Sequence, residues 1–357
     1  MGQKLSNDNV GDHFLGINSF YEAQRKLLPE LDTLLIKRYR MLQVIHMQGP
    51  IGRRTLAELL QLTERDIRNE VQTLNEQRLI EVQSKGMVCT SLGEIVIEQL
   101  KEQFHELTGI AKKEQKLKNA FQIERVIIIN GNLETDSTTL AMLGKEAKNV
   151  LVQVAKPNSQ IAVTGGSSVA AIAPFLQPQK PLDTAQFIAA RGGIGDEMTL
   201  QANTLAAQFA IKCESKHRTL FLPEQLSEQA YATMKNEPVV KEVVALYDQI
   251  NIVIHGIGVA DEMAERRNSS EQDKKLLHEL GAVGEAFGYY FDEQGQIVHH
   301  IRTIGIQLEQ VEKSDVVIAI AGGVHKANAI QAYFKHAAKQ TILIMGESAA
   351  DEILKQL

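Results

Sequence analysis

The chain has 357 residues, of which 44% are apolar and 23% charged, and this composition excludes a chain that is disordered throughout. At roughly 150 residues per domain, the length predicts two or three domains. The net charge of −6 argues weakly against nucleic acid as a partner, but the charge is uneven. Residues 33–90 carry nine basic and six acidic groups, net +3, whereas residues 91–357 carry 26 basic and 33 acidic groups, net −7.

Three features of the sequence predict a cytoplasmic protein without a membrane segment. The longest apolar stretches, such as 315–321, are far shorter than the roughly 20 residues of a membrane helix. The first ten residues lack the basic and hydrophobic regions of a secretory signal. Cys89 and Cys213 lie far apart in sequence, which favours reduced thiols over a disulfide. Residues 1–20 are polar and predict a flexible tail.

Residues 21–90 predict three helices followed by two short strands. Asp32 is the expected cap of the first helix, which ends at Gly49-Pro50, and Thr63 is the expected cap of the third. The second helix is expected over about 55–60, the third over about 64–77, and the strands over 79–82 and 86–90 with a turn at Lys85-Gly86. This order of elements predicts a winged helix-turn-helix domain.

In a winged helix-turn-helix the third helix enters the major groove of DNA. Its early side chains here are of the types that pair with guanine or adenine, namely Arg65, Arg68, Asn69 and Gln72. Phosphate contacts are expected from Arg53 and Arg54, placed just before the second helix, and from Lys85 in the wing. The alternative is a small helical bundle whose charged face is merely solvated.

The rest of the chain predicts an α/β domain. Residues 91–117 form a single amphipathic helix in this prediction, which either covers the first module or serves as a linker or dimerisation helix. From 118 to 357 short apolar runs alternate with helical stretches, as in a doubly wound parallel sheet. The expected strands are 125–129, 160–164, 186–190, 219–222, 251–255, 315–321 and 341–345, with an antiparallel hairpin over 287–298.

Glycines follow three of these strands, in Thr164-Gly-Gly-Ser-Ser168, Arg191-Gly-Gly193 and Gly322-Gly323, the last with Lys326 close by. Open α/β sheets bind ligands at the carboxyl ends of their strands, and hydroxyls and amides there bind anions. The three turns together predict an anionic small molecule, although each alone could be a plain connection. Residues 255–261 have Asp261 where a dinucleotide fingerprint has its third glycine, so no nicotinamide cofactor is expected. No metal motif is evident.

Several motifs in order resemble one family. They are the residues at 51–54, 163–166, 190–193, 201–203, 255–258, 266–268, 285–291 and 321–326. From about residue 21 to its end the chain resembles the SorC/DeoR-type bacterial repressors that control glycolytic genes. The resemblance implies a DNA-binding domain joined to an effector domain similar to sugar-phosphate isomerases and deaminases. It also implies operator DNA as a partner, a homo-oligomer (dimer or tetramer) and fructose 1,6-bisphosphate as effector.

The resemblance also assigns residues. One phosphate would be held by Thr164, Gly165, Gly166, Ser167 and Ser168, and the rest of the sugar bisphosphate by Arg191, Gln201, Arg266, Glu285 and Lys326. Enzymes of this superfamily have a catalytic Asp-Gly-His stretch after a Gly-x-Gly turn, whereas Val259-Ala-Asp-Glu-Met263 stands here. The resemblance therefore implies a sensor rather than an enzyme. The alternatives are a sugar-phosphate isomerase or deaminase with an appended interaction domain, or a regulator that responds to another phosphosugar.

Overall fold

The structure is a computed structural model, which describes residues 26–134 and 136–357. The flexible tail predicted over 1–20, and the first residues of the module predicted over 21–90, lie outside these ranges. In the part of the chain that the structure describes, no helix has both the length and the apolar character needed to cross a membrane. The chain divides into two compact units that meet between Gly109 and Ile110. They are called here the first and the second unit.

The first unit is a winged helix-turn-helix, as predicted. Its elements are α2 (Glu30–Gln48), α3 (Arg53–Leu60), α4 (Glu64–Glu76), β1 (Ile80–Gln83), β2 (Gly86–Cys89) and α5 (Ser91–Leu107). The strands pair in antiparallel register across the turn at 84–85, and Gly86, the first residue of β2, has a φ of +135°, which requires glycine. One core of Met41, Ile45, Leu56, Ile67 and Leu74 joins the three helices.

Two details of the helix starts differ from the prediction. The cap position of α2 is Pro29, so Asp32 lies within the first turn, where a carboxylate is favoured by the helix dipole. Helix α3 begins at Arg53, so Arg53 and Arg54 belong to its first turn and do not precede it. The prediction for α4 is confirmed, because the Thr63 hydroxyl accepts a hydrogen bond from the Asp66 amide at 3.2 Å.

The single helix predicted over 91–117 is wrong. The structure has α5 and, after a break at Thr108-Gly109, α6 (Ile110–Phe121). Gly109 has a φ of +73°, which a right-handed helix cannot contain. Helix α5 packs on the first unit, where the rings of Phe104 and Tyr39 stack at 4.3 Å. The amphipathic pattern continues through the break because each of the two helices covers a core of its own.

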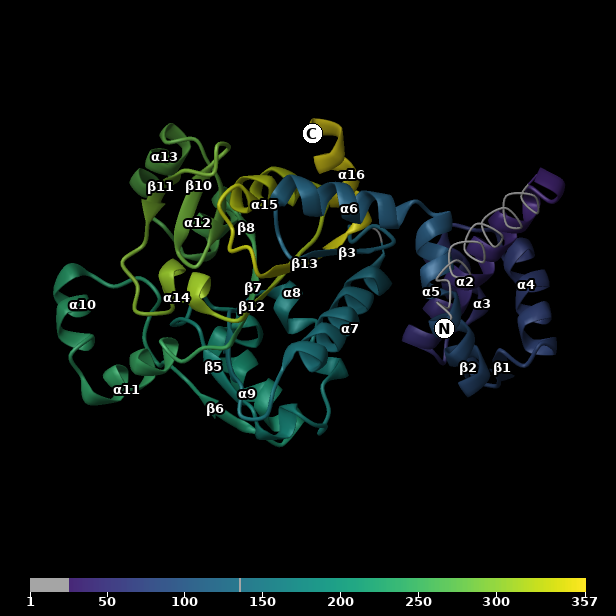
Figure 1. Cartoon of the computed structure of the whole chain (residues 1–357), viewed down its shortest axis with the longest axis horizontal. Helices are drawn as coiled ribbons and strands as arrows, with labels where there is room; N and C mark the ends of the chain where they lie inside the picture. Colours follow the sequence, from purple (N-terminus) through teal and green to yellow (C-terminus); the bar gives the residue numbers. More distant parts are fainter. Residues whose placement is uncertain (1–25, 135) are drawn as a thin grey trace, which may run out of the picture. The chain divides into compact units, whose positions relative to one another are not determined.

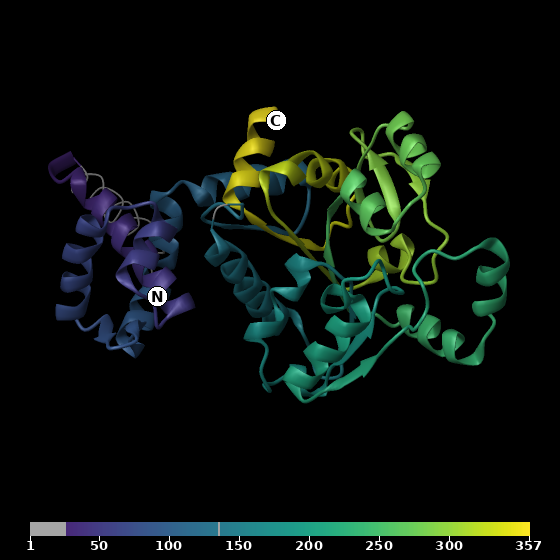
Figure 2. The same cartoon turned by 180° about the vertical axis from the view of Figure 1, so that it is seen from behind.

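The second unit is built on a seven-stranded parallel sheet (Figures 1 and 2). Its strands, in spatial order, are β3 (Arg125–Ile129), β13 (Thr341–Gly346), β12 (Val316–Ala321), β7 (Ile252–Gly256), β4 (Gln160–Val163), β5 (Gln186–Ala189) and β6 (Lys216–Arg218). Helices α6, α15 (Ala327–Phe334) and α16 (Glu347–Gln356) lie on one face, and α7 (Ser137–Val154), α8 (Ser167–Ala170) and α9 (Ala202–Cys213) on the other. The doubly wound α/β fold is therefore confirmed.

The strand predicted at 219–222 is wrong, because β6 lies just upstream of it. This strand pairs with β5 alone, at the edge of the sheet, and its three residues Lys216, His217 and Arg218 are all exposed. An edge strand with charged side chains resists pairing with other chains. It contains no apolar run from which a strand could be predicted in the sequence. The apolar run that follows is irregular, and its Phe221 is 83% exposed.

A smaller antiparallel sheet follows β7 and packs on α15. Its strands, in spatial order, are β11 (Ile297–His300), β10 (Tyr289–Asp292), β9 (Ala282–Ala286) and β8 (Gly258–Val259). The hairpin predicted over 287–298 is the β10–β11 pair. The remaining helices are α10 (Glu228–Met234), α11 (Pro238–Tyr247), α12 (Ala260–Arg266), α13 (Glu271–Glu279) and α14 (Leu308–Lys313).

Candidate functional site

The order of strands in the large sheet marks one place where a ligand pocket is expected. Strands β4 and β7 are neighbours, and the chain continues from β4 to β5 on one side and from β7 to β12 on the other. At such a reversal the loops after the two strands separate and leave a crevice at their carboxyl ends. The Gly165-Gly166 turn follows β4, and Gly256-Ile-Gly258 follows β7.

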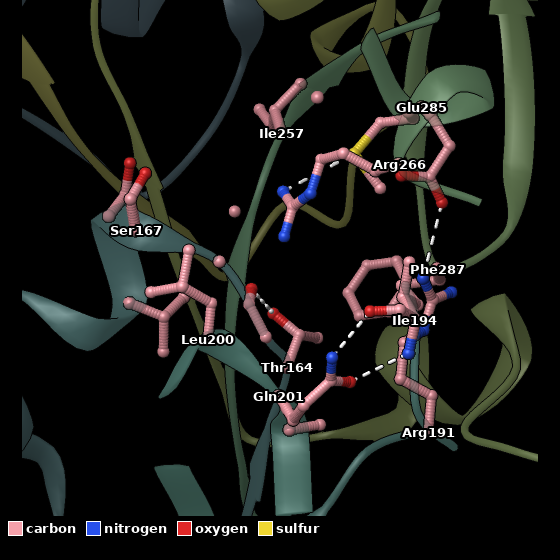
Figure 3. A pocket seen from close by; sticks show the side chains of 18 of the residues that line it. Thr164, Ser167, Arg191, Ile194, Leu200, Gln201, Ile257, Arg266, Glu285 and Phe287 are labelled. Carbon is pink, nitrogen blue, oxygen red and sulfur yellow. Dashed lines mark hydrogen bonds and ion pairs between the residues drawn. The ribbon is translucent and has the colours of Figure 1, made fainter. Parts of the chain in front are cut away.

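A pocket lies at this point (Figure 3). All ten residues that the resemblance assigns to the effector line it: Thr164, Gly165, Gly166, Ser167, Ser168, Arg191, Gln201, Arg266, Glu285 and Lys326. They come from the segments that follow β4, β5 and β12, from the start of α9, from α12 and from the small sheet. The structure thus brings together residues as far apart in the sequence as Thr164 and Lys326.

The turn after β4 needs both of its glycines. A Cβ on Gly165 would stand 2.4 Å from the Leu200 carbonyl oxygen, and Gly166 has a φ of +114°. The Gly166 amide donates to that same carbonyl at 2.9 Å, so it is not free for a ligand. Helix α8, which this turn opens, has only four residues. The hydroxyls of Ser167 and Ser168 are therefore the main groups that this turn offers to the pocket.

Arg266 and Lys326 give one part of the pocket a net positive charge. The Arg266 guanidinium extends into the pocket in Figure 3, and its nearest polar contact is the Met263 sulfur at 3.9 Å. Burial, together with the charge of Arg266, lowers the pKa of Lys326 despite the opposing charge of Glu262. Among the described residues no carboxylate forms an ion pair with either side chain. Two unpaired cations in one pocket are suited to an anion.

Arg191 and Glu285 also line the pocket and are already paired. Their atoms Nη1 and Oε1 lie 3.4 Å apart, and Arg191 Nη1 also forms an ion pair of 2.5 Å with Glu224. Burial alone would raise the pKa of Glu285, but the charges of Arg267 and Arg191 and the Gly288 amide lower it. Glu285 is therefore a carboxylate at neutral pH and can accept hydrogen bonds from hydroxyls.

Gln201 lines the pocket, but its amide holds a loop. Its Oε1 accepts from the Ile194 amide at 2.7 Å, and its Nε2 donates to the carbonyls of Ile194 and Glu197, the latter at 3.1 Å. Figure 3 shows the side chain turned toward Ile194. In this structure Gln201 therefore fixes the loop 194–200 at the rim, rather than presenting its amide to the pocket.

The residues predicted for DNA lie on exposed surface of the first unit. Arg65, Arg68, Asn69 and Gln72 follow the spacing of one helix face, and all four are exposed. The opposite face of α4 carries Ile67, Val71 and Leu74 into the core. Arg53, Arg54 and Lys85 are exposed as well. Two of these side chains have partners within their own helix, because Arg54 pairs with Glu58 at 3.1 Å and Gln72 donates to Glu76 at 2.9 Å.

Comparison with known proteins matches each unit to a family. Residues 34–104 match the family described as "CggR N-terminal DNA binding domain", and residues 105–355 match the "Putative sugar-binding domain" family. A crystal structure of a SorC family transcriptional regulator from Enterococcus faecalis has a TM-score of 0.64 and 39% identity to this chain. The match covers 68% of this chain and 99% of the solved chain.

Two relatives match over nearly the whole length. The central glycolytic genes regulator of Priestia megaterium is 41% identical over 341 residues, or 95% of this chain and 99% of the relative. The regulator of the same name from Bacillus subtilis is 37% identical over 339 residues, with the same coverage. The chain belongs to the SorC/DeoR family, in the group of the central glycolytic genes regulators.

This SorC/DeoR regulator is a transcriptional repressor that joins a DNA-binding domain to a sugar-binding domain and is modulated by a sugar. It is not an enzyme, because its relatives are regulators of transcription. The predictions of family, fold class and regulatory function are thus confirmed. The alternative of an isomerase or deaminase with an appended domain is set aside by the same relatives.

Two buried residues of this regulator escaped the sequence prediction. Arg267 forms an ion pair with Glu285, Glu224 forms one with Arg191, and Arg267 and Glu224 also pair with each other. The sequence predicts either a solvated helix face or phosphate contacts for Arg266-Arg267, and it does not show that the two side chains point in different directions. Glu224 follows an irregular segment and has no motif around it. The apolar residues Ile257, Met263 and Phe287, which also line the pocket, had no distinguishing signal either.

The buried imidazole of His255 predicts that the second unit loses stability as the pH falls. Burial lowers the pKa of His255 from 6.5 to about 4. The unfolded chain thus binds a proton near pH 6.5, whereas the folded chain binds it only near pH 4. The free energy of unfolding is therefore expected to fall by about 2 kcal/mol between pH 7 and pH 5 from this group. Urea unfolding of the wild type and His255→Gln at both pH values measures it, and an equal pH dependence in the two proteins contradicts it.

Proposed function

We propose that this regulator represses glycolytic genes and that fructose 1,6-bisphosphate, bound in the pocket of the second unit, modulates its binding to operator DNA. The observation that carries this proposal is the pair of unpaired cations, Arg266 and Lys326, in the pocket that Ser167 and Ser168 also line. Arginine and lysine are the side chains that bind phosphate best, and hydroxyls donate to its oxygens. One phosphate of the sugar is assigned to this part of the pocket.

Arg191 and Glu285 would bind the rest of the sugar. Glu285 accepts hydrogen bonds from sugar hydroxyls, and Arg191 donates to hydroxyls or to the second phosphate. Gln201 keeps the loop 194–200 against the pocket. Thr164, Gly165 and Gly166 shape the turn that allows the ligand to approach. The names of the two relatives, central glycolytic genes regulators, support the glycolytic targets.

The first unit would bind operator DNA through α4, with Arg65, Arg68, Asn69 and Gln72 at the bases and Arg53, Arg54 and Lys85 at phosphates. We propose that the protein acts in the cytoplasm as a homo-oligomer, a dimer or a tetramer. A ligand changes DNA affinity only if it binds one conformation better than the other. Fructose 1,6-bisphosphate would therefore favour the conformation in which the DNA-binding units contact the operator less well together.

A panel of phosphosugars tests the proposal directly. Thermal unfolding is measured with fructose 1,6-bisphosphate, fructose 6-phosphate, glucose 6-phosphate and inorganic phosphate. At 100 times its dissociation constant a ligand adds about 2.7 kcal/mol to stability, and fructose 1,6-bisphosphate is expected to give the largest shift. Gel retardation on operator DNA then shows whether that ligand weakens the complex. A larger shift with another sugar favours a different effector, and no shift with any of them contradicts the proposal.

A further inference from the structure

Four charged side chains form a buried cluster against the wall of the pocket: Arg191, Glu224, Arg267 and Glu285. Their side chains are only 6%, 2%, 2% and 4% exposed, respectively. Arg191 and Glu285 line the pocket, whereas Glu224 and Arg267 do not. The function proposed above therefore has no role for Glu224 and Arg267, although both are among the most deeply buried charges of the second unit.

Arg267 stands at the centre of this cluster. Its Nε and Nη2 form a fork on Glu224, at 2.7 Å to Oε2 and 3.1 Å to Oε1. Its Nη2 also donates to Glu285 Oε1 at 3.0 Å, and its Nη1 donates to the Tyr290 hydroxyl at 3.1 Å. Such a forked pair fixes direction as well as distance. Glu224 in turn binds Arg191, so every charge in the cluster contacts at least two groups of opposite sign or a hydroxyl.

These contacts orient the Glu285 carboxylate. Its Oε1 accepts from Arg267, from Arg191 and from the Gly288 amide. The other oxygen, Oε2, is 3.7 Å from the position that a Cβ at Gly258 would take, and Gly258 lines the pocket. The cluster therefore uses one oxygen of Glu285 for its own hydrogen bonds and leaves the other near Gly258, on the side of the pocket.

The cluster also sets the charge of this wall. Two arginines and two glutamates sum to zero, whereas Arg266 and Lys326 contribute two unpaired positive charges elsewhere in the pocket. A neutral wall with a fixed acceptor and a fixed guanidinium is suited to sugar hydroxyls, and a positive wall to phosphate. Arg191 Nε is buried and has no hydrogen-bond partner among the described residues. A cluster that served stability alone would be expected to pair that donor.

We propose that Glu224 and Arg267 are positioning residues, which hold Arg191 and Glu285 in the orientation and charge state that bind the sugar part of the effector. This inference rests on the proposed function, since it concerns the same pocket. Glu224 and Arg267 touch no ligand and act only through their two partners. They therefore matter for the sugar, and not for the phosphate held by Arg266 and Lys326.

The test compares a sugar phosphate with phosphate alone. The dissociation constants of fructose 1,6-bisphosphate and of inorganic phosphate are measured by calorimetry or thermal shift on the full chain. Glu224→Gln is expected to weaken binding of the sugar bisphosphate about tenfold or more, because it releases Arg191 from a charged hydrogen bond. Its binding of inorganic phosphate is expected to stay within about twofold of the wild type. A general loss of structure would weaken both ligands alike.

Glu224→Gln leaves two buried arginines with only one carboxylate, and this imbalance could prevent folding; a second variant keeps the test valid in that case. Glu224→Gln with Arg267→Met removes one charge of each sign, so the buried Arg191–Glu285 pair stays neutral, and the same selective loss is expected. The matched control is Glu265→Gln on α12, which removes the ion pair of 2.8 Å between Glu265 and Lys274 at the surface. This variant is expected to change neither dissociation constant.

The possible outcomes separate the two proposals. If the wild type binds the sugar bisphosphate and both variants bind it equally well, Glu224 and Arg267 are structural and this inference fails while the proposed function stands. The inference also fails if the variants lose both ligands in parallel. If the wild type binds inorganic phosphate but no sugar phosphate, the proposed function fails and the inference fails with it.

Discussion

Replacing Lys326 by Met is expected to weaken binding of fructose 1,6-bisphosphate by about 30-fold or more. The Lys326 side chain is half-buried and lines the pocket, and among the described residues no carboxylate pairs with it. Removing one partner of a buried charge pair in a complex costs about 2–5 kcal/mol, because the phosphate is then left without its counter-charge. Calorimetry with the wild type and Lys326→Met measures the loss.

The same substitution is expected to stabilise the protein without ligand. Burial penalises the charged amine of Lys326, which is why its pKa is lowered, and a methionine of similar length does not carry that penalty. Lys241→Met, at an exposed position on α11, is the matched control and should alter neither property. If Lys326→Met binds the sugar bisphosphate as tightly as the wild type, the phosphate does not lie beside Lys326.

Operator binding provides a further check on Lys326→Met. The first unit is a separate compact body, so the variant should retain full affinity for operator DNA and lose only the response to the sugar. In gel retardation the complex of the variant with operator DNA would persist at effector concentrations that disrupt the wild-type complex. A variant that fails to bind DNA at all would show that Lys326 has a role other than in effector binding.

Three turns of the pocket could be predicted from the sequence because of the geometry of parallel sheets, whereas Gln201 and Glu285 came only from the resemblance to the family. Each glycine turn follows a strand that the apolar pattern identified, and parallel strands end at one edge of the sheet. The Gly165-Gly166 turn, Arg191 and Lys326 therefore had to lie near one another once the strands were known. The reversal between β4 and β7, which places the crevice, depends on strand order, and the residue pattern alone does not give that order.

The roles of Arg267 and Glu224 in the buried cluster could not be predicted in the same way. Helix α12 ends at Arg266, and Arg267 occupies the cap position that follows. That boundary sends one side chain into the pocket and the next into the buried cluster. A shift of one residue in the helix end would exchange their roles, and helix ends are the least certain part of a prediction from sequence. The break at Gly109 was not predicted because the apolar pattern continues through it. The edge strand β6 was not predicted because it contains no apolar residue.

Replacing Arg65 and Arg68 by Ala is expected to abolish preference for the operator. Both side chains are exposed on α4, one helical turn apart on the face opposite Ile67 and Val71. A bidentate contact to a base contributes about 1–3 kcal/mol of discrimination, so two contacts contribute about 2–6 kcal/mol, a loss of 30-fold or more. The fold should persist, because neither side chain belongs to the core of the first unit.

Arg54→Ala is the informative contrast to this double variant. Arg54 lies in the first turn of α3 and is 82% exposed, in the place proposed for a phosphate contact. Its loss should weaken binding to the operator and to a random duplex alike, and should reduce the salt dependence of binding by about one phosphate contact. Retardation of a duplex selected by the wild type, and of a random duplex, is measured at several salt concentrations. If the Arg65 and Arg68 variant weakened both duplexes equally, α4 would contact the backbone of DNA and the base contacts would have to come from another element.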